Sequence, residues 1–199
     1  MIAIFDIQHR GKPGRRAGEM GAGFDFDGDG VIEIHEQEAY LTPIYAGAAS
    51  ERLALAGEKV VFLEYGTYAE RHAKAIQIAR STSEPVAYIA CHLNAGGGDY
   101  GIILHDDRSV NGHRLSKHLA AALRAGFPVP RVTTKGTAIA GTWKRAHTTI
   151  AGIYDGPENL TGVCYEPAFI DKHAHLLTPE GLGAIGKALA AGVLAWSNG

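Results

Sequence analysis

Short apolar runs alternate with helical stretches along the chain, and this alternation limits the possible folds more than any other feature. Runs of four to eight apolar residues are typical of buried strands, and the stretches between them carry small and apolar residues at helical spacing. A chain that alternates in this way favours a largely parallel sheet with helices on both faces. We therefore expect an α/β fold with a mostly parallel, twisted sheet of about six strands.

The expected elements follow from these periods. The strands cover residues 2–7, 59–63, 85–92, 100–105 and 160–165. The helices cover residues 36–56, 67–80, 114–125 and 179–196. Residues 126–158 are mixed and fit neither period. Because no internal repeat or low-complexity segment divides the chain, we expect a single domain over residues 1–199.

Composition excludes several classes of protein. The chain has 199 residues, of which 46% are hydrophobic and 20% charged, so it can bury a proper core. A formal charge of −2 gives no reason to expect nucleic-acid binding. No apolar run has the length of a membrane-spanning helix, and no feature indicates an obligate protein partner. Two cysteines, Cys91 and Cys164, are too few for a disulfide framework, and we expect buried free thiols.

The beginning of the chain does not have the pattern of a secretory signal peptide. It has no basic leader, and Asp6 interrupts the first apolar run after five residues. Two origins of the chain stay open. Either an exported precursor has been trimmed, or the protein is made in the cytoplasm and released by lysis.

Polar residues capable of catalysis stand at the ends of expected strands. His9 and His92 each end a strand, Glu166 ends the last one, and Glu38 lies in the first turn of a helix. Ligands of such sheets bind at the carboxyl ends of the strands, and catalytic zinc takes three nitrogen or oxygen ligands and keeps a fourth position open. We expect a zinc site with Glu166 as base. Structural histidines and a glutamate placed for the helix dipole stay as the alternative.

The motifs around these residues resemble the zinc-dependent N-acetylmuramoyl-L-alanine amidases called amidase type 3. The family's Asp-Pro-Gly-His-Gly-Gly corresponds to residues 6–11, Ser-Ile-His-Ala-Asn-Ala to residues 90–95, and Val-Glu-x-Gly-Phe-Ile/Leu to residues 165–170. Counting back from Gly57, where the first long helix ends, gives Glu38 as the family's glutamate ligand, with Glu36 as a competing choice. The first motif departs from the family at its proline and at two of its glycines.

The resemblance implies an activity. It implies hydrolysis of the amide bond between N-acetylmuramic acid and L-alanine in bacterial peptidoglycan, by a phage endolysin or an isolated catalytic domain. Zinc would be held by His9, Glu38 and His92, and Glu166 would act as base. Two alternatives stay open: a zinc peptidase or amidase acting on another peptide amide, and a non-catalytic, calcium-binding module that recognises the cell wall.

A second metal is indicated between the first strand and the first long helix. Residues 25–36 match the EF-hand loop, with acidic side chains at positions 1, 3, 5 and 12 and Gly30 at position 6. The expected calcium ligands are side chains and one backbone carbonyl: Asp25, Asp27, Asp29, Val31 and Glu36. Because the Gly-rich residues 11–23 do not suit an entering helix, we expect a lone loop with only an exiting helix. The alternative is an acidic, solvated turn.

Basic residues are concentrated just after His9. They are Arg10, Lys12, Arg15 and Arg16. A solvated basic loop is the favoured interpretation, and contact with carboxylates of a stem peptide is the alternative.

Overall fold

A six-stranded sheet runs through the molecule in the order β2-β1-β3-β6-β4-β5. The computed structural model describes residues 1–9, 21–138 and 143–199. Its strands are β1 (Ile2–Ile7), β2 (Lys59–Leu63), β3 (Val86–Cys91), β4 (Gly101–Asp106), β5 (Val132–Thr137) and β6 (Leu160–Glu166). The strands β2, β1, β3 and β6 are mutually parallel, whereas β4 runs antiparallel to β6 and parallel to β5. The expected mostly parallel α/β sheet is confirmed.

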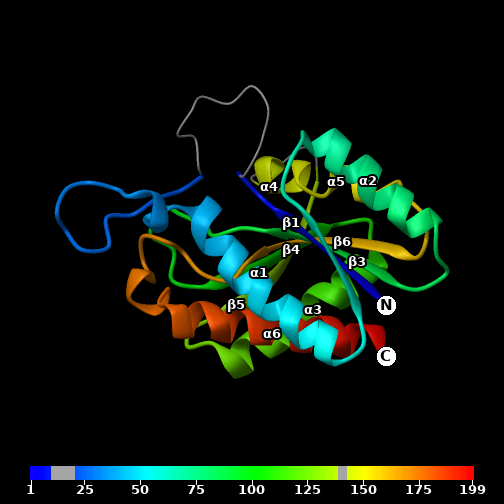
Figure 1. Cartoon of the computed structure of the whole chain (residues 1–199). Coiled ribbons are helices and arrows are strands. Elements are labelled where there is room, and N and C mark those ends of the chain that lie inside the picture. Colours follow the sequence, from blue (N-terminus) through cyan, green and yellow to red (C-terminus); the bar gives the residue numbers. More distant parts are fainter. Residues whose placement is uncertain (10–20, 139–142) are drawn as a thin grey trace.

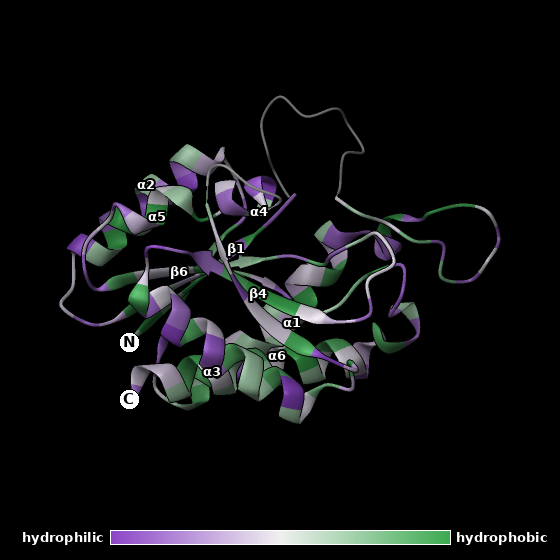
Figure 2. Cartoon of the chain, turned by 180° about the vertical axis from the view of Figure 1, so that it is seen from behind, coloured by the Kyte–Doolittle hydropathy of each residue, from purple (hydrophilic) through white to green (hydrophobic). Residues whose placement is uncertain are grey.

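Helices cover both faces of this sheet (Figures 1 and 2). One face carries α1 (Glu38–Leu55), α3 (Val110–Gly126) and α6 (Pro179–Ser197). The other carries α2 (Tyr68–Arg80) and the short α4 (Lys144–Thr148) and α5 (Ala151–Tyr154). Two 3₁₀ turns, η1 (Ile34–Glu36) and η2 (Ala174–Leu176), complete the elements of the described residues. No described helix is long and apolar enough to span a membrane.

Each central strand contributes to two cores because successive side chains point to opposite faces. In β1, Ala3, Phe5 and Ile7 pack toward α1, α3 and α6, while Ile2 and Ile4 pack toward α2 and α5. Burial on both faces explains why the strand reads as a nearly continuous apolar run. The same alternation sends the two cysteines to opposite cores, and both are buried free thiols as expected.

The structure corrects the sequence expectations at the sheet edge. Residues 132–137 form the edge strand β5, although this stretch fits neither period. Its sequence, VTTKGT, holds only one apolar residue, since little of an edge strand is buried. Helix α3 begins at Val110 rather than at residue 114, because Ser109 caps it by accepting a hydrogen bond from the Gly112 N–H at 2.9 Å.

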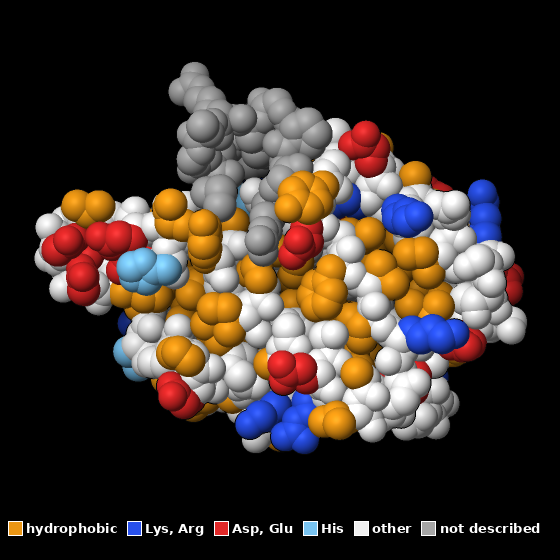
Figure 3. Space-filling view, in the orientation of Figure 1, with side chains coloured by type: hydrophobic (Ala, Val, Ile, Leu, Met, Phe, Trp, Pro, Cys, Tyr) orange, Lys and Arg blue, Asp and Glu red, His pale blue; other side chains and the backbone are white. Residues whose placement is uncertain are grey.

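The segment that leads into α1 projects from the body as a loop. Figure 1 shows this excursion, and Figure 3 shows acidic side chains gathered on it. It ends in η1, and α1 follows two residues later as the expected exiting helix. Most of the stretch 11–23, where the sequence predicts no entering helix, lies outside the described residues. The basic residues Arg10, Lys12, Arg15 and Arg16 lie outside the described residues.

The packing of α6 against α1 depends on a glycine. A Cβ at Gly186 would lie 2.4 Å from the Tyr45 carbonyl oxygen and 2.7 Å from the Ala48 Cβ, whereas one at Gly183 would meet nothing within 4 Å. We predict that Gly186→Ala lowers the free energy of unfolding by about 1–3 kcal/mol. The matched Gly183→Ala should leave it unchanged or raise it by up to ~1 kcal/mol. Urea unfolding measures both, and equal effects would contradict this account of the helix contact.

Candidate metal centre

Three strand ends meet at one edge of the sheet. The parallel register pairs Ile7 with Cys91 and Cys91 with Tyr165. His92, which follows β3, and Glu166, the last residue of β6, are therefore neighbours. The His92 N–H still donates to the Tyr165 carbonyl at 3.0 Å. His9 follows β1 two residues after its end. The topology thus brings distant parts of the sequence to one place.

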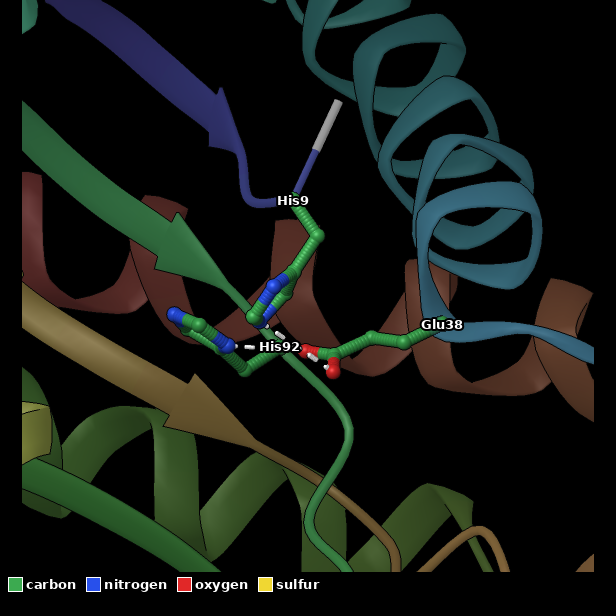
Figure 4. A group of neighbouring side chains, drawn as sticks. All are labelled: His9, Glu38 and His92. Atoms are coloured by element: carbon green, nitrogen blue, oxygen red, sulfur yellow. Dashed lines mark hydrogen bonds and ion pairs between the residues drawn. The ribbon is translucent and has the colours of Figure 1, made fainter. Parts of the chain in front are cut away.

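Glu38 joins the two histidines (Figure 4). It is the first residue of α1, and its carboxylate points to the strand ends. The His92 Nδ1 lies 2.7 Å from Glu38 Oε1, and the His9 Nε2 lies 3.4 Å from Glu38 Oε2. The two imidazole rings stand edge to face, with centroids 5.3 Å apart. Two nitrogens and a carboxylate therefore converge at a single point.

The Glu38 carboxylate is buried, at 2% exposure, yet well supplied with donors. Besides His92, the Leu93 N–H donates to Oε1 at 3.0 Å and the Ala22 N–H donates to Oε2 at 3.1 Å. Burial alone would raise the pKa of Glu38, but attraction to His92 and His9 and these hydrogen bonds outweigh it, so the pKa lies below its ordinary value. Glu38 is therefore held as the anion, the form that binds a metal.

A buried ion pair fixes the chain just before His9. Asp6 pairs with Arg71 of α2, which is 1% exposed, and also accepts hydrogen bonds from Gln8 and Tyr88. The Arg71 guanidinium donates further to the carbonyl of Ile7 at 2.7 Å. Removing one partner of such a buried pair typically costs about 3–5 kcal/mol, so the network holds the end of β1 firmly.

The backbone at His9 takes an unusual form. Its φ is +62°, in the left-handed region that residues other than glycine rarely adopt. Gly21 approaches from the other side, with φ +85°, and a Cβ there would lie 2.6 Å from Glu38 Oε2 and 2.9 Å from His9 Cδ2. The left-handed turn thus directs the His9 ring toward Glu38, and the glycine leaves room for the contact.

Glu166 lies in the same cavity without joining the cluster. The Asn94 side-chain amide donates to its Oε2 at 2.6 Å, and the Cys164 thiol is 3.8 Å from its Oε1. Burial raises the pKa of Glu166 to about 7, with His92 opposing and Glu38 adding to the shift. A carboxyl with a pKa near neutrality can both take up and release a proton, as a general base and acid must.

The cavity that contains these groups has a volume of about 650 Å³. His9, Glu38, His92 and Glu166 line one part of it. Tyr68 at the start of α2 lines the rest together with residues in and just after α4, which are Arg145, Ala146, Thr148 and Thr149. The mixed segment that the sequence left unassigned therefore forms a wall of the candidate site.

The donor set suits a divalent metal. One ligand atom each from His9, Glu38 and His92 lies within 4.8 Å of the others, in the combination of two imidazoles and a carboxylate that zinc accepts. Among the described residues, the His92 Nε2 is buried without a hydrogen-bond partner, so this ring has unmet capacity. The competing Glu36 is not at this cluster. It accepts from Phe26 N–H at 2.6 Å and Glu33 N–H at 2.9 Å in the projecting loop.

The projecting loop brings its acidic side chains into overlapping groups, one of which joins Glu33 and Glu36 with His35. Asp25, Asp27 and Glu36 converge within 4.8 Å, and Asp27 and Asp29 converge with Glu33. The Gly30 N–H donates to Asp25 Oδ2 at 2.8 Å. The Val31 N–H donates to Asp29 Oδ1 at 2.8 Å, and Val31 itself is exposed. Three of the residues expected to hold calcium, Asp25, Asp27 and Glu36, are therefore close together, whereas Asp29 groups with Asp27 and Glu33.

Comparison with known proteins identifies the fold. No protein-family model matches the chain, and no curated protein matches it in sequence. Among solved structures, the N-acetylmuramoyl-L-alanine amidase AmiC2 of Nostoc punctiforme matches with a TM-score of 0.69 and 13% identity, over 100% of this chain and 98% of that one. The catalytic domain of the CD27L endolysin targeting Clostridia difficile matches with a TM-score of 0.64 and 18% identity, over 98% and 97% of the two chains.

The chain shares its fold with solved N-acetylmuramoyl-L-alanine amidases. Cwp6 from Clostridium difficile also matches, with a TM-score of 0.70 and 19% identity. That match covers 98% of this chain but only 29% of Cwp6, so the chain spans less than a third of that protein. The amidase fold expected from the motifs is thus found in the structure, at identities too low to show more than the fold.

Several contributors to the site were missed in the sequence. Arg71 is a buried cation on α2. The other residues of this helix have the pattern of an ordinary amphipathic helix at the surface. Tyr45 of α1 donates to the His92 carbonyl at 3.1 Å, and nothing in a lone tyrosine signals this role. Some of the other histidines are buried structural groups. His72, for example, contacts the Thr149 carbonyl at 2.9 Å, and His173 pairs with Asp99 at 3.0 Å.

Proposed function

We propose that this protein is a zinc-dependent hydrolase of bacterial peptidoglycan that cleaves the amide bond between N-acetylmuramic acid and L-alanine. The observation that carries the proposal is the convergence of His9, Glu38 and His92 beside Glu166 in a cavity of the amidase fold. Action at the cell wall, as by an endolysin, follows from the same substrate. The structural neighbours named as such amidases support the substrate assignment.

The residues of the cavity suit this hydrolysis. His9, Glu38 and His92 would hold zinc, which when bound supplies Lewis acidity to water and to the scissile carbonyl. Glu166 would accept the proton of the attacking water on its carboxylate and deliver it to the departing L-alanine nitrogen as the C–N bond breaks. Asn94 holds one Glu166 oxygen at 2.6 Å, and the long contact of 3.8 Å from Cys164 leaves the other able to take the proton.

Two other functions remain as alternatives to be tested against this one. A zinc peptidase or amidase acting on another peptide amide would use the same ligands and base. A non-catalytic module that recognises the wall would need neither a buried metal ligand set nor a carboxyl with raised pKa. The presence of both in one cavity favours an enzyme.

Release of L-alanine amino termini from purified peptidoglycan tests the proposal. We predict release by the wild type and loss of about 10²–10⁴-fold in rate for Glu166→Gln, the contribution usual for a general base. Removal of zinc by a chelator should abolish release, and added zinc should restore it. Glu51→Gln, at an exposed position on α1, is the matched control and should retain full activity.

Each contrary result points to one alternative. Cleavage of another bond without new L-alanine termini would overturn the substrate and favour another amide. Absence of any cleavage on several types of wall would favour the recognition module.

We also propose that residues 25–36 bind calcium through Asp25, Asp27, Asp29, Glu36 and the Val31 carbonyl. The EF-hand pattern and the closeness of the acidic groups support this proposal. Bound calcium would order the loop that leads into α1 and so fix the start of the helix that presents Glu38. Its role would be stabilisation and not chemistry.

Thermal unfolding with and without calcium tests the loop. We predict that calcium raises the Tm of the wild type, since a ligand at a hundredfold excess over its Kd stabilises by about 2.7 kcal/mol. Asp25→Asn should lose this rise, and Asp107→Asn, an exposed aspartate outside the loop, should keep it. An equal rise in the wild type and Asp25→Asn, or none in the wild type, would refute the site.

A further inference from the structure

One cation lines the cavity of the candidate metal centre. Arg145, on α4, is exposed and is the one lysine or arginine among the described residues that line this cavity. Within the described part of the chain it has no hydrogen-bond or ion-pair partner, unlike Arg71 and Arg108, which pair with Asp6 and Asp106. Arg145 is therefore free to bind a ligand.

The charges of the cavity favour one orientation of a substrate. The carboxylates of Glu38 and Glu166 belong to the strand-end part, while the guanidinium of Arg145 belongs to the α4 wall. In the proposed enzyme, zinc and Glu166 would hold the scissile amide at the strand ends, so Arg145 is the group left to attract an anionic part of the substrate that lies further along the cavity. A substrate with a neutral amide and a nearby carboxylate would thus place the amide at the strand ends and the carboxylate at α4.

A peptidoglycan stem peptide has this chemistry. Its second residue, D-glutamate, is linked onward through its side chain, so its α-carboxyl is either a free carboxylate or amidated. This group lies within about two residue lengths, roughly 7 Å, of the amide nitrogen of L-alanine. The cavity volume of about 650 Å³ accommodates such a dipeptide. A guanidinium binds a carboxylate with two parallel hydrogen bonds, which a neutral carboxamide cannot reproduce.

We propose that Arg145 binds the free α-carboxylate of the second stem residue and makes the enzyme prefer walls in which this group is not amidated. The inference rests on the proposed amidase function and extends it to substrate selection. Arg145 is a specificity residue and takes no part in proton transfer.

Two synthetic substrates test the inference: N-acetylmuramoyl-L-alanyl-D-glutamate and the matching D-isoglutamine compound. We predict that the wild type has a kcat/KM about ten- to a hundredfold higher for the D-glutamate compound, the range expected of a charge-assisted hydrogen-bonded pair. Arg145→Gln should lose this preference, mainly by a rise in KM for the D-glutamate compound. Arg145→Lys should keep part of it, because a lysine retains the charge without the two-pronged geometry.

The matched control is Lys144→Gln. It removes the same charge from the adjacent residue of α4, which does not line the cavity, so the preference should persist. A wild type without preference, or an Arg145→Gln variant that keeps it, would overturn the inference while the amidase function stands. Cleavage of neither compound by the wild type would refute the proposed function, and the inference with it.

Discussion

The Glu38 carboxylate is the interaction on which the candidate site depends. It accepts from His92 at one oxygen and faces His9 at the other, so it joins the ends of β3 and β1 to the start of α1. A buried carboxylate is stable only where donors satisfy it, and the backbone N–H groups of Leu93 and Ala22 complete its set. The site is thus built into the fold, and a metal would replace contacts that already hold these three side chains together.

Positions far from the metal ligands contribute to this arrangement through the backbone. The Asp6–Arg71 pair fixes the end of β1 to α2, and Gln8 also contacts Asp6. The chain turns left-handed at the next residue, His9. The amidase type 3 motif has glycine and proline before its histidine, whereas this chain has Ile7 and Gln8. In this chain the buried network stabilises the left-handed turn, because Ile7 and Gln8 do not favour it through their own backbone preferences.

Periodicity was sufficient to predict the central strands and the long helices, because both faces of β1 and β3 are buried and leave nearly continuous apolar runs. It was insufficient for β5 and for α4, whose few buried residues leave no period to detect. His9, His92 and Glu166 could be placed at one edge because parallel strands end together, whereas Glu38 was located by counting back along a helix from Gly57. Arg71 and Arg145 could not, because a buried or cavity-lining arginine has the same sequence signature as a solvated one.

The central claim is that His9, Glu38 and His92 together bind one zinc ion. An anomalous difference map, recorded above the zinc absorption edge from crystals of the protein grown with zinc, tests it most directly. The account predicts one strong peak at about 2.0–2.2 Å from a ring nitrogen of each histidine and from a Glu38 oxygen. A map without a peak at these three residues, or with zinc only at the acidic loop, would contradict it.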